Sequence, residues 1–120
     1  MSQYNTGFKA FIAYEDIDRH LAVKLTSSTG DYVSVAGSNE ASIGFADETV
    51  ASGEYVTVKL KNMGGTFKAT ASAAVTAGAA LYNQASGKVS SVSGGTQRYV
   101  ALEAADADGD VIEVLPVYMY

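Results

Sequence analysis

A short unit recurs along this chain: a glycine, in most copies an acidic residue, and then a run of residues that favour β-strands. The clear copies are residues 30–35, 53–58 and 109–114, and a degenerate copy covers residues 78–82. Glycine adopts turn conformations that a β-branched residue resists, whereas Tyr, Val, Ile and Thr suit a pleated, half-buried surface. Four such turn-then-strand units in 120 residues predict a compact, mainly β domain.

The length suits one domain with a core of its own. We therefore expect a small single-domain β-barrel or sandwich with at most a short helix. Strand order cannot be read from periodicity, so the choice between barrel and sandwich stays open. Residues 8–14 are apolar and could form a strand or an arm. The division that we predict is a flexible N-terminal arm over residues 1–14 and a β-rich domain over residues 15–120.

Residues 55–61 alternate in the strand period, with Val56, Val58 and Leu60 on one face, so this strand is expected to bury one side. Residues 62–65 carry a turn signal, which predicts residues 66–70 as the hairpin partner of this strand. Two strand-loop-strand segments, residues 43–58 and 100–114, also resemble each other. They predict an approximate internal repetition.

Composition excludes several classes of function. The chain has no cysteine, which excludes disulfides and thiolate chemistry. Eight basic and thirteen acidic residues give a formal charge of −5, and the basic residues are scattered, so no nucleic-acid partner is expected. No apolar run is long enough to span a bilayer and the N-terminus lacks the pattern of a signal peptide. We expect a soluble protein that is made inside the cell and has no membrane partner.

No constellation of residues predicts an enzyme, a cofactor or a metal site. His20 is the only histidine and stands beside charged neighbours without a nucleophile motif. Asp106, Asp108 and Asp110 could offer oxygens to a calcium ion, but further ligands at the required spacing are missing, which favours an Asp- and Gly-rich β-turn. The acidic residues 15–18 are interpreted as a solvated turn. Catalytic, cofactor-binding and metal-binding residues are therefore predicted to be none.

Aromatic residues gather towards both ends of the chain. Tyr and Met are favoured at protein–protein interfaces, so we expect the ends to contact another subunit or a partner. The predicted contact residues are Tyr4, Phe8, Phe11, Tyr14, Tyr118 and Tyr120.

The order of these segments resembles a known family. An opening Phe-Lys-Ala segment leads to residues 21–25, then to Ser-Ile-Gly-Phe-Ala at 42–46 and to the Gly-Glu strand at 53–58. Gly78, Leu81 and Tyr82 follow, then a Ser-Gly-Lys-Val turn at 86–89, and Ala-Leu-Glu-Ala-Ala at 101–105 leads into the last Gly-Asp strand. This order is similar to that of the capsid decoration, or cement, proteins of tailed bacteriophages, and the resemblance covers residues 8–115.

The resemblance implies a structural function. Such proteins attach to the exterior of the expanded head, commonly as homotrimers, and clamp neighbouring subunits of the major capsid protein against the pressure of packaged DNA. The expected location is the capsid exterior of the virion, after synthesis in the host cytoplasm. The alternative is another virion binding module, either a tail component or a carbohydrate-binding β domain. For sugar binding, Tyr32 with Asp31 or Tyr55 with Glu54 would be the aromatic platforms.

Overall fold

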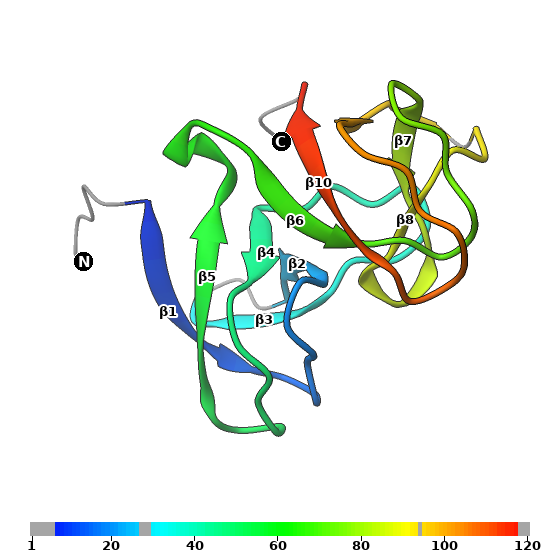
Figure 1. Ribbon diagram of the computed structural model, residues 1–120. Helices are drawn as coiled ribbons and strands as arrows, with labels where there is room; N and C mark the ends of the chain where they lie inside the picture. Colours follow the sequence, from blue (N-terminus) through cyan, green and yellow to red (C-terminus); the bar gives the residue numbers. More distant parts are fainter. Residues whose placement is uncertain (1–6, 27–29, 94, 118–120) are drawn as a thin grey trace.

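The computed structural model describes residues 7–26, 30–93 and 95–117. Strands dominate these ranges, joined by turns and two short 3₁₀ segments, as the predicted mainly β single domain requires (Figure 1). The first five strands are β1 (Phe8–Ala13), β2 (Ala22–Leu25), β3 (Tyr32–Val35), β4 (Gly44–Ala46) and β5 (Tyr55–Leu60). The others are β6 (Phe67–Thr70), β7 (Ala80–Asn83), β8 (Val89–Ser90), β9 (Tyr99–Ala101) and β10 (Val111–Pro116), and the 3₁₀ segments are η1 (Lys61–Met63) and η2 (Ala85–Gly87). No helix in the described ranges is long and apolar enough to cross a membrane.

The first half of the chain is a closed five-stranded barrel with the strand order β1-β3-β2-β4-β5. It closes where β1 pairs antiparallel with β5 along its length, and β1 also pairs in parallel with β3 through Ile12 and Ala13. Alternate residues point inward and fill the interior, as in other small barrels. The buried interior residues are Phe11, Ala13, Ile17, Val23, Val33, Ala46, Val56 and Val58. The inward direction predicted for Val56 and Val58 is confirmed.

Residues 8–13, which were predicted to belong to a flexible arm, form a strand of the barrel. Residues 8–13 are β1 itself, hydrogen-bonded to β5 over five registered pairs, so the strand alternative holds for this segment. The physical reason is Phe11 and Ala13, which complete the barrel interior and are almost fully buried. Of the proposed arm, residues 1–6 lie outside the described residues.

The second half is a five-stranded sheet with the order β6-β10-β9-β7-β8, curved into a half-barrel beside the barrel (Figure 1). Its open side is filled by residues from the outer wall of the barrel, Ala22, Ala36 and Phe45, which join its core cluster. The Phe45 ring lies 5.6 Å from that of Phe67 and 5.4 Å from that of Tyr99. The half-barrel is thus completed by the barrel rather than by a strand of its own.

The predicted hairpin between residues 55–61 and 66–70 is wrong. β6 pairs antiparallel with β10, not with β5. After Leu60 the chain leaves the barrel through η1 and two glycines with positive φ, Gly64 and Gly65, and enters the second sheet. The turn signal therefore marks the passage between the two halves.

The two halves repeat one hydrogen-bonding scheme, which confirms the internal repetition expected from residues 43–58 and 100–114. Each half has a parallel contact between its first and third strands and an antiparallel pair between its fourth and fifth strands. Matching bonds from amide to carbonyl are Ala13 to Glu54 and Ala71 to Asp110, Tyr14 to Val33 and Ser72 to Val89, and Ile17 to Val50 and Val75 to Ala105. The chain therefore contains two copies of one five-stranded unit.

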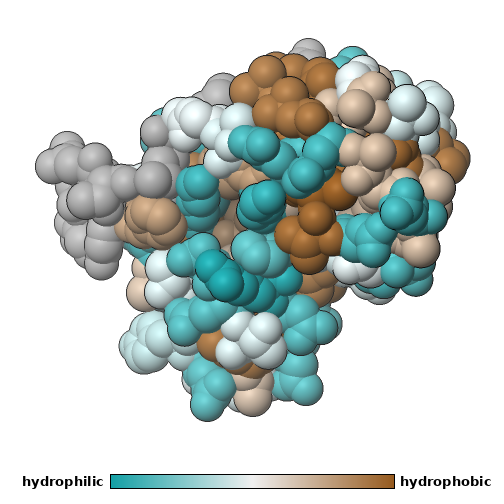
Figure 2. All heavy atoms as spheres, viewed as in Figure 1, coloured by the Kyte–Doolittle hydropathy of each residue, from teal (hydrophilic) through white to brown (hydrophobic). Residues whose placement is uncertain are grey.

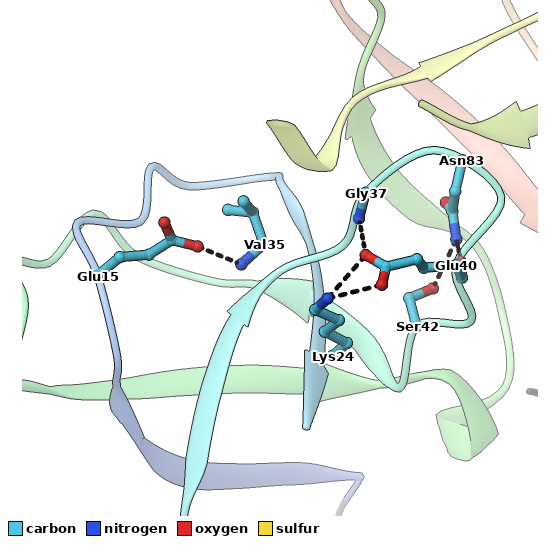
Figure 3. A network of polar contacts seen from close by, with 7 residues as sticks. All are labelled: Glu15, Lys24, Val35, Gly37, Glu40, Ser42 and Asn83. Atoms are coloured by element: carbon cyan, nitrogen blue, oxygen red, sulfur yellow. Dashed lines mark hydrogen bonds and ion pairs between the residues drawn. The ribbon is translucent and has the colours of Figure 1, made fainter. Parts of the chain in front are cut away.

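A polar network that is buried at Ser42, Asn83 and Tyr99 joins the copies. The Tyr99 hydroxyl lies 2.8 Å from Ser42 Oγ and donates to Asn83 Oδ1 at 2.9 Å. Asn83 Nδ2 donates to the Glu40 carbonyl, and the Glu40 side chain accepts from Lys24 Nζ and from the Gly37 amide (Figure 3). Burial raises the pKa of Tyr99 to about 12, so its hydroxyl stays protonated and able to donate.

Candidate binding surfaces

The barrel carries an exposed aromatic face on its outer wall. Ile12 of β1 is the register partner of both Tyr32 on β3 and Tyr55 on β5, so these three side chains lie in a row on one side of the sheet. Tyr14 follows β1, and its ring meets that of Tyr32 edge-on at 6.4 Å between centroids. We call Ile12, Tyr14, Tyr32 and Tyr55 the tyrosine face.

The rings of this face are unusually accessible. Tyr55 is 71% exposed, Tyr14 65% and Tyr32 38%. The backbone that carries them is held in the barrel wall, because their sequence neighbours Ala13, Val33 and Val56 are packed in the barrel interior. Tyrosine supplies a large contact area with few rotatable bonds and a polar tip, which suits a protein interface. Fixed, solvent-facing rings are what a docking surface needs.

A groove opens beside the tyrosine face, between β1 and the end of β2. Its volume is about 760 Å³, and Ile12 and Tyr55 form part of its lining. The remaining walls combine apolar side chains with one cation and one carboxylate. These residues are Phe11, Leu25, Ile43 and Leu60, with Lys9 and Asp31. We call this feature the β1 groove.

The predicted contact residues fall into three groups. Tyr14 is exposed and belongs to the tyrosine face, which keeps it a candidate. Phe11 is only 6% exposed because it packs in the barrel core, and Phe8 is half-buried at the start of β1. Tyr4, Tyr118 and Tyr120 lie outside the described residues.

Sequence reasoning did not place Tyr32 and Tyr55 among the contact residues, although it named them as possible sugar platforms. A signal for them exists in the chain. Each follows a glycine–acid turn and precedes a buried valine, so strand alternation puts the tyrosine outward. Only the β1 register shows that the two rings flank the same isoleucine.

A second, apolar face lies on the outside of the half-barrel. Val111, Leu115 and Val117 follow the outward side of the β10 segment, and Leu102 lies beside them after β9. Each is between 41% and 47% exposed. Figure 2 shows brown, apolar surface over the C-terminal end of β10, bordered by teal polar side chains. We call these four residues the β10 face.

Carboxylates in both acidic segments accept hydrogen bonds from main-chain amides. The Asp110 carboxylate accepts from the amides of Asp106 and Ala107, at 2.8 and 3.2 Å, as expected for an Asp-rich β-turn. In the other acidic segment Glu15 accepts from the Val35 amide and Asp16 from the Ser52 amide. In the described part of the chain, no three His, Cys, Asp or Glu side chains are grouped so that they could hold a metal ion.

His20 joins the two copies through its backbone. It has a positive φ of 70°, and its carbonyl accepts from the amide and the hydroxyl of Thr70. Burial, followed by the positive charge of Arg19, lowers the pKa of its imidazole. The contacts of His20 are those of a structural residue at the junction.

Residues 12–116 match the family model described as phage cement protein. The chain belongs to the phage cement protein family. It is therefore a structural protein of the phage head. A search of curated proteins finds no match.

Among solved structures, the N base of head fiber gp8.5 in bacteriophage phi29 has a similar fold. The two chains share 15% sequence identity with a TM-score of 0.79, and the alignment covers 91% of this cement-family chain and 92% of the other. At this identity the likeness concerns the fold, which extends over both repeated halves.

Proposed function

We propose that this cement-family protein binds the exterior of the expanded head and clamps neighbouring subunits of the major capsid protein. The clamp stabilises the shell against the pressure of packaged DNA. The observation that carries the proposal is the tyrosine face, a row of exposed rings on a rigid barrel wall. Membership of the cement family supports the same role. Binding only to the expanded lattice would stabilise that lattice by mass action.

The two faces suit different partners. The tyrosine face, with its polar tips, suits a partner that the free protein meets late, whereas the β10 face is aliphatic apart from Glu113, which lies between Val111 and Leu115. We assign the tyrosine face to the shell and the β10 face to contacts between copies in a homotrimer. Apolar area of this kind is typical of contacts between identical subunits. The net charge of −5 would keep the free protein soluble.

Sedimentation with heads of the same phage tests the shell contact. We expect saturable binding to expanded, undecorated heads and none to unexpanded precursor shells. The double variant Tyr14→Ser/Tyr55→Ser should bind at least tenfold more weakly, because central aromatic side chains each contribute about 1 kcal/mol or more at interfaces. The matched control is Val92→Ser, which removes a side chain that is also 65% exposed but lies on neither face.

Equal binding by the double variant and the control would contradict the assigned face. Absence of binding to either kind of particle would contradict the clamp itself. For the trimer, light scattering should show three copies for the wild type and a monomer for Leu115→Asp. A wild-type monomer both free and on heads would contradict the trimer.

Carbohydrate binding remains the second candidate, since Asp31 and Tyr55 line one groove. Glu54 fits that role less well, because its carboxylate already accepts from the Ala51 amide at 2.8 Å. A glycan array in which binding depends on Tyr55 would favour this alternative.

A further inference from the structure

We propose that the β1 groove receives an extended segment of the major capsid protein, which adds as a strand to the open edge of β1. This inference rests on the proposed function for the source of the segment. It goes beyond it by naming the recognition mode, main-chain pairing, and the residues that provide it.

The first observation is an incomplete seam in the barrel. On one side, β1 is paired with β5 from Phe8 to Ile12. On the other side its registered pairs with β3 are limited to Ile12 and Ala13, with bonds from the Ile12 amide to the Asp31 carbonyl and from the Tyr14 amide to the Val33 carbonyl. In the described ranges, β1 has no hydrogen-bonded strand on this side before Ile12.

The second observation is the direction of the main-chain groups at this seam. The Ala13 amide bonds to β5 and the Gly7 carbonyl accepts from Leu60, so the odd-numbered residues of β1 face β5. The main-chain groups of Phe8 and Ala10 therefore point to the open side. Ala10 is exposed there. Such an edge is a ready template for another strand.

The third observation is what borders this edge. The β1 groove runs along it, with Leu25, Ile43 and Leu60 as apolar walls and Asp31 at the rim. A strand paired with residues 8–10 would turn alternate side chains into the groove and away from it. Main-chain bonds would then give affinity and the apolar walls would select the inserted side chains, as in other cases of strand addition.

These features favour a polypeptide over a sugar as the occupant. A sugar presents mainly hydroxyl groups and would leave the apolar walls poorly covered. An extended segment offers donors and acceptors at the spacing of β1 together with apolar side chains. The groove also shares Ile12 and Tyr55 with the tyrosine face, so one shell subunit could contact both.

The decisive variant is Ala10→Pro. It removes an amide donor that points to the groove, while the β1–β5 bonds, made by its odd-numbered neighbours, are retained; proline is tolerated at such edge positions. Ala10→Ser is the matched control, since it keeps the amide and nearly the same size. We expect Ala10→Pro to bind expanded heads at least tenfold more weakly and Ala10→Ser to stay within twofold of the wild type. A second variant, Leu25→Asp, tests the groove wall without altering β1.

Hydrogen exchange on the wild type gives a reading that does not depend on the variants. The amides of Phe8 and Ala10 should exchange more slowly on heads than in the free protein, whereas the Lys9 amide, which faces β5, should change little. Undiminished binding by both Ala10→Pro and Leu25→Asp, or unchanged exchange at Phe8 and Ala10 on bound heads, would overturn the groove assignment and leave the clamp intact.

A peptide array separates the two proposals if heads are not bound. The probe is a set of overlapping twelve-residue peptides covering the major capsid protein of the same phage. A peptide that binds the wild type but not Ala10→Pro would support the groove even without head binding. If neither heads nor any peptide bind, the groove assignment is overturned together with the clamp.

Discussion

Lys61 allows a direct test of how a buried charge affects the free energy of unfolding where the barrel meets the half-barrel. It follows β5 at the start of η1, and only 2% of the residue is exposed. Among the described residues its ammonium has no hydrogen-bond partner, and it lies 5.6 Å from the centre of the Tyr99 ring. Burial, and then the charge of Arg98, lower the pKa of Lys61 from 10.5 to about 8.

The sign of the pH dependence follows from this shift. Between about pH 8 and pH 10.5 the unfolded chain keeps the Lys61 proton while the folded chain loses it. The free energy of unfolding must therefore rise with pH across that window. The full shift corresponds to about 3 kcal/mol, of which about 2 kcal/mol is reached by about pH 9.5.

Replacing Lys61 by methionine removes the ammonium and keeps an unbranched apolar side chain. We expect Lys61→Met to be more stable than the wild type near pH 7 by about 1 to 3 kcal/mol, as when other buried charges are replaced by apolar residues. The advantage should shrink by about 2 kcal/mol at about pH 9.5, because the wild type then loses its buried charge.

Urea unfolding followed by circular dichroism at several pH values measures both quantities. Each pH compares variant with wild type, so the titration of other groups cancels. Lys61→Gln serves as the control that removes charge but not polarity, and it should lose the pH dependence with less gain in stability. A difference between Lys61→Met and wild type that stays constant from about pH 7 to about pH 9.5 would refute the argument.

Three further substitutions probe the packing. Gly44→Ala places a Cβ 2.1 Å from the Lys59 carbonyl oxygen across the β4–β5 pair, and should lower the free energy of unfolding by about 3 kcal/mol; a loss under about 1 kcal/mol would contradict this close approach. Tyr99→Phe leaves Ser42 and Asn83 without their hydroxyl partner and should cost about 1 to 3 kcal/mol in urea unfolding, whereas a neutral outcome would mean that the network contributes little. Phe45→Ala empties the contact between barrel and half-barrel and should cost about 3 to 5 kcal/mol while near- and far-ultraviolet signals still change together; separate transitions would show that the halves unfold independently.

Patterns among neighbouring residues predicted most of the strands of the fold. The glycine–acid units begin β3, β5 and β10 where the sequence places them, because their turns need positive φ and their strands alternate cleanly. The resemblance between residues 43–58 and 100–114 likewise corresponds to the two equivalent strand pairs β4–β5 and β9–β10. These features depend on neighbouring residues, which a sequence displays directly.

Pairing between strands that lie far apart in the sequence could not be predicted in the same way. A turn signal at residues 62–65 suits a hairpin, but β6 finds its partner in β10, far along the chain. Phe45 points out of the barrel and would be read as exposed, yet it is 2% exposed because the second half packs over it. For the binding surfaces, an aromatic side chain in an apolar run looks the same whether it faces inward, as Phe11 does, or outward, as Tyr55 does.

The internal duplication gives a reason to connect the tyrosine face with function. Matching hydrogen bonds make Tyr14 equivalent to Ser72, Tyr32 to Lys88 and Tyr55 to Val111. The same scaffold is therefore built in the second half without any of the three rings, so the fold does not require them. Rings that are 71% and 65% exposed, as for Tyr55 and Tyr14, also bury little area and add little stability to the free protein. A role in binding explains their presence better than a role in folding, and the proposed clamp on the shell would cover them.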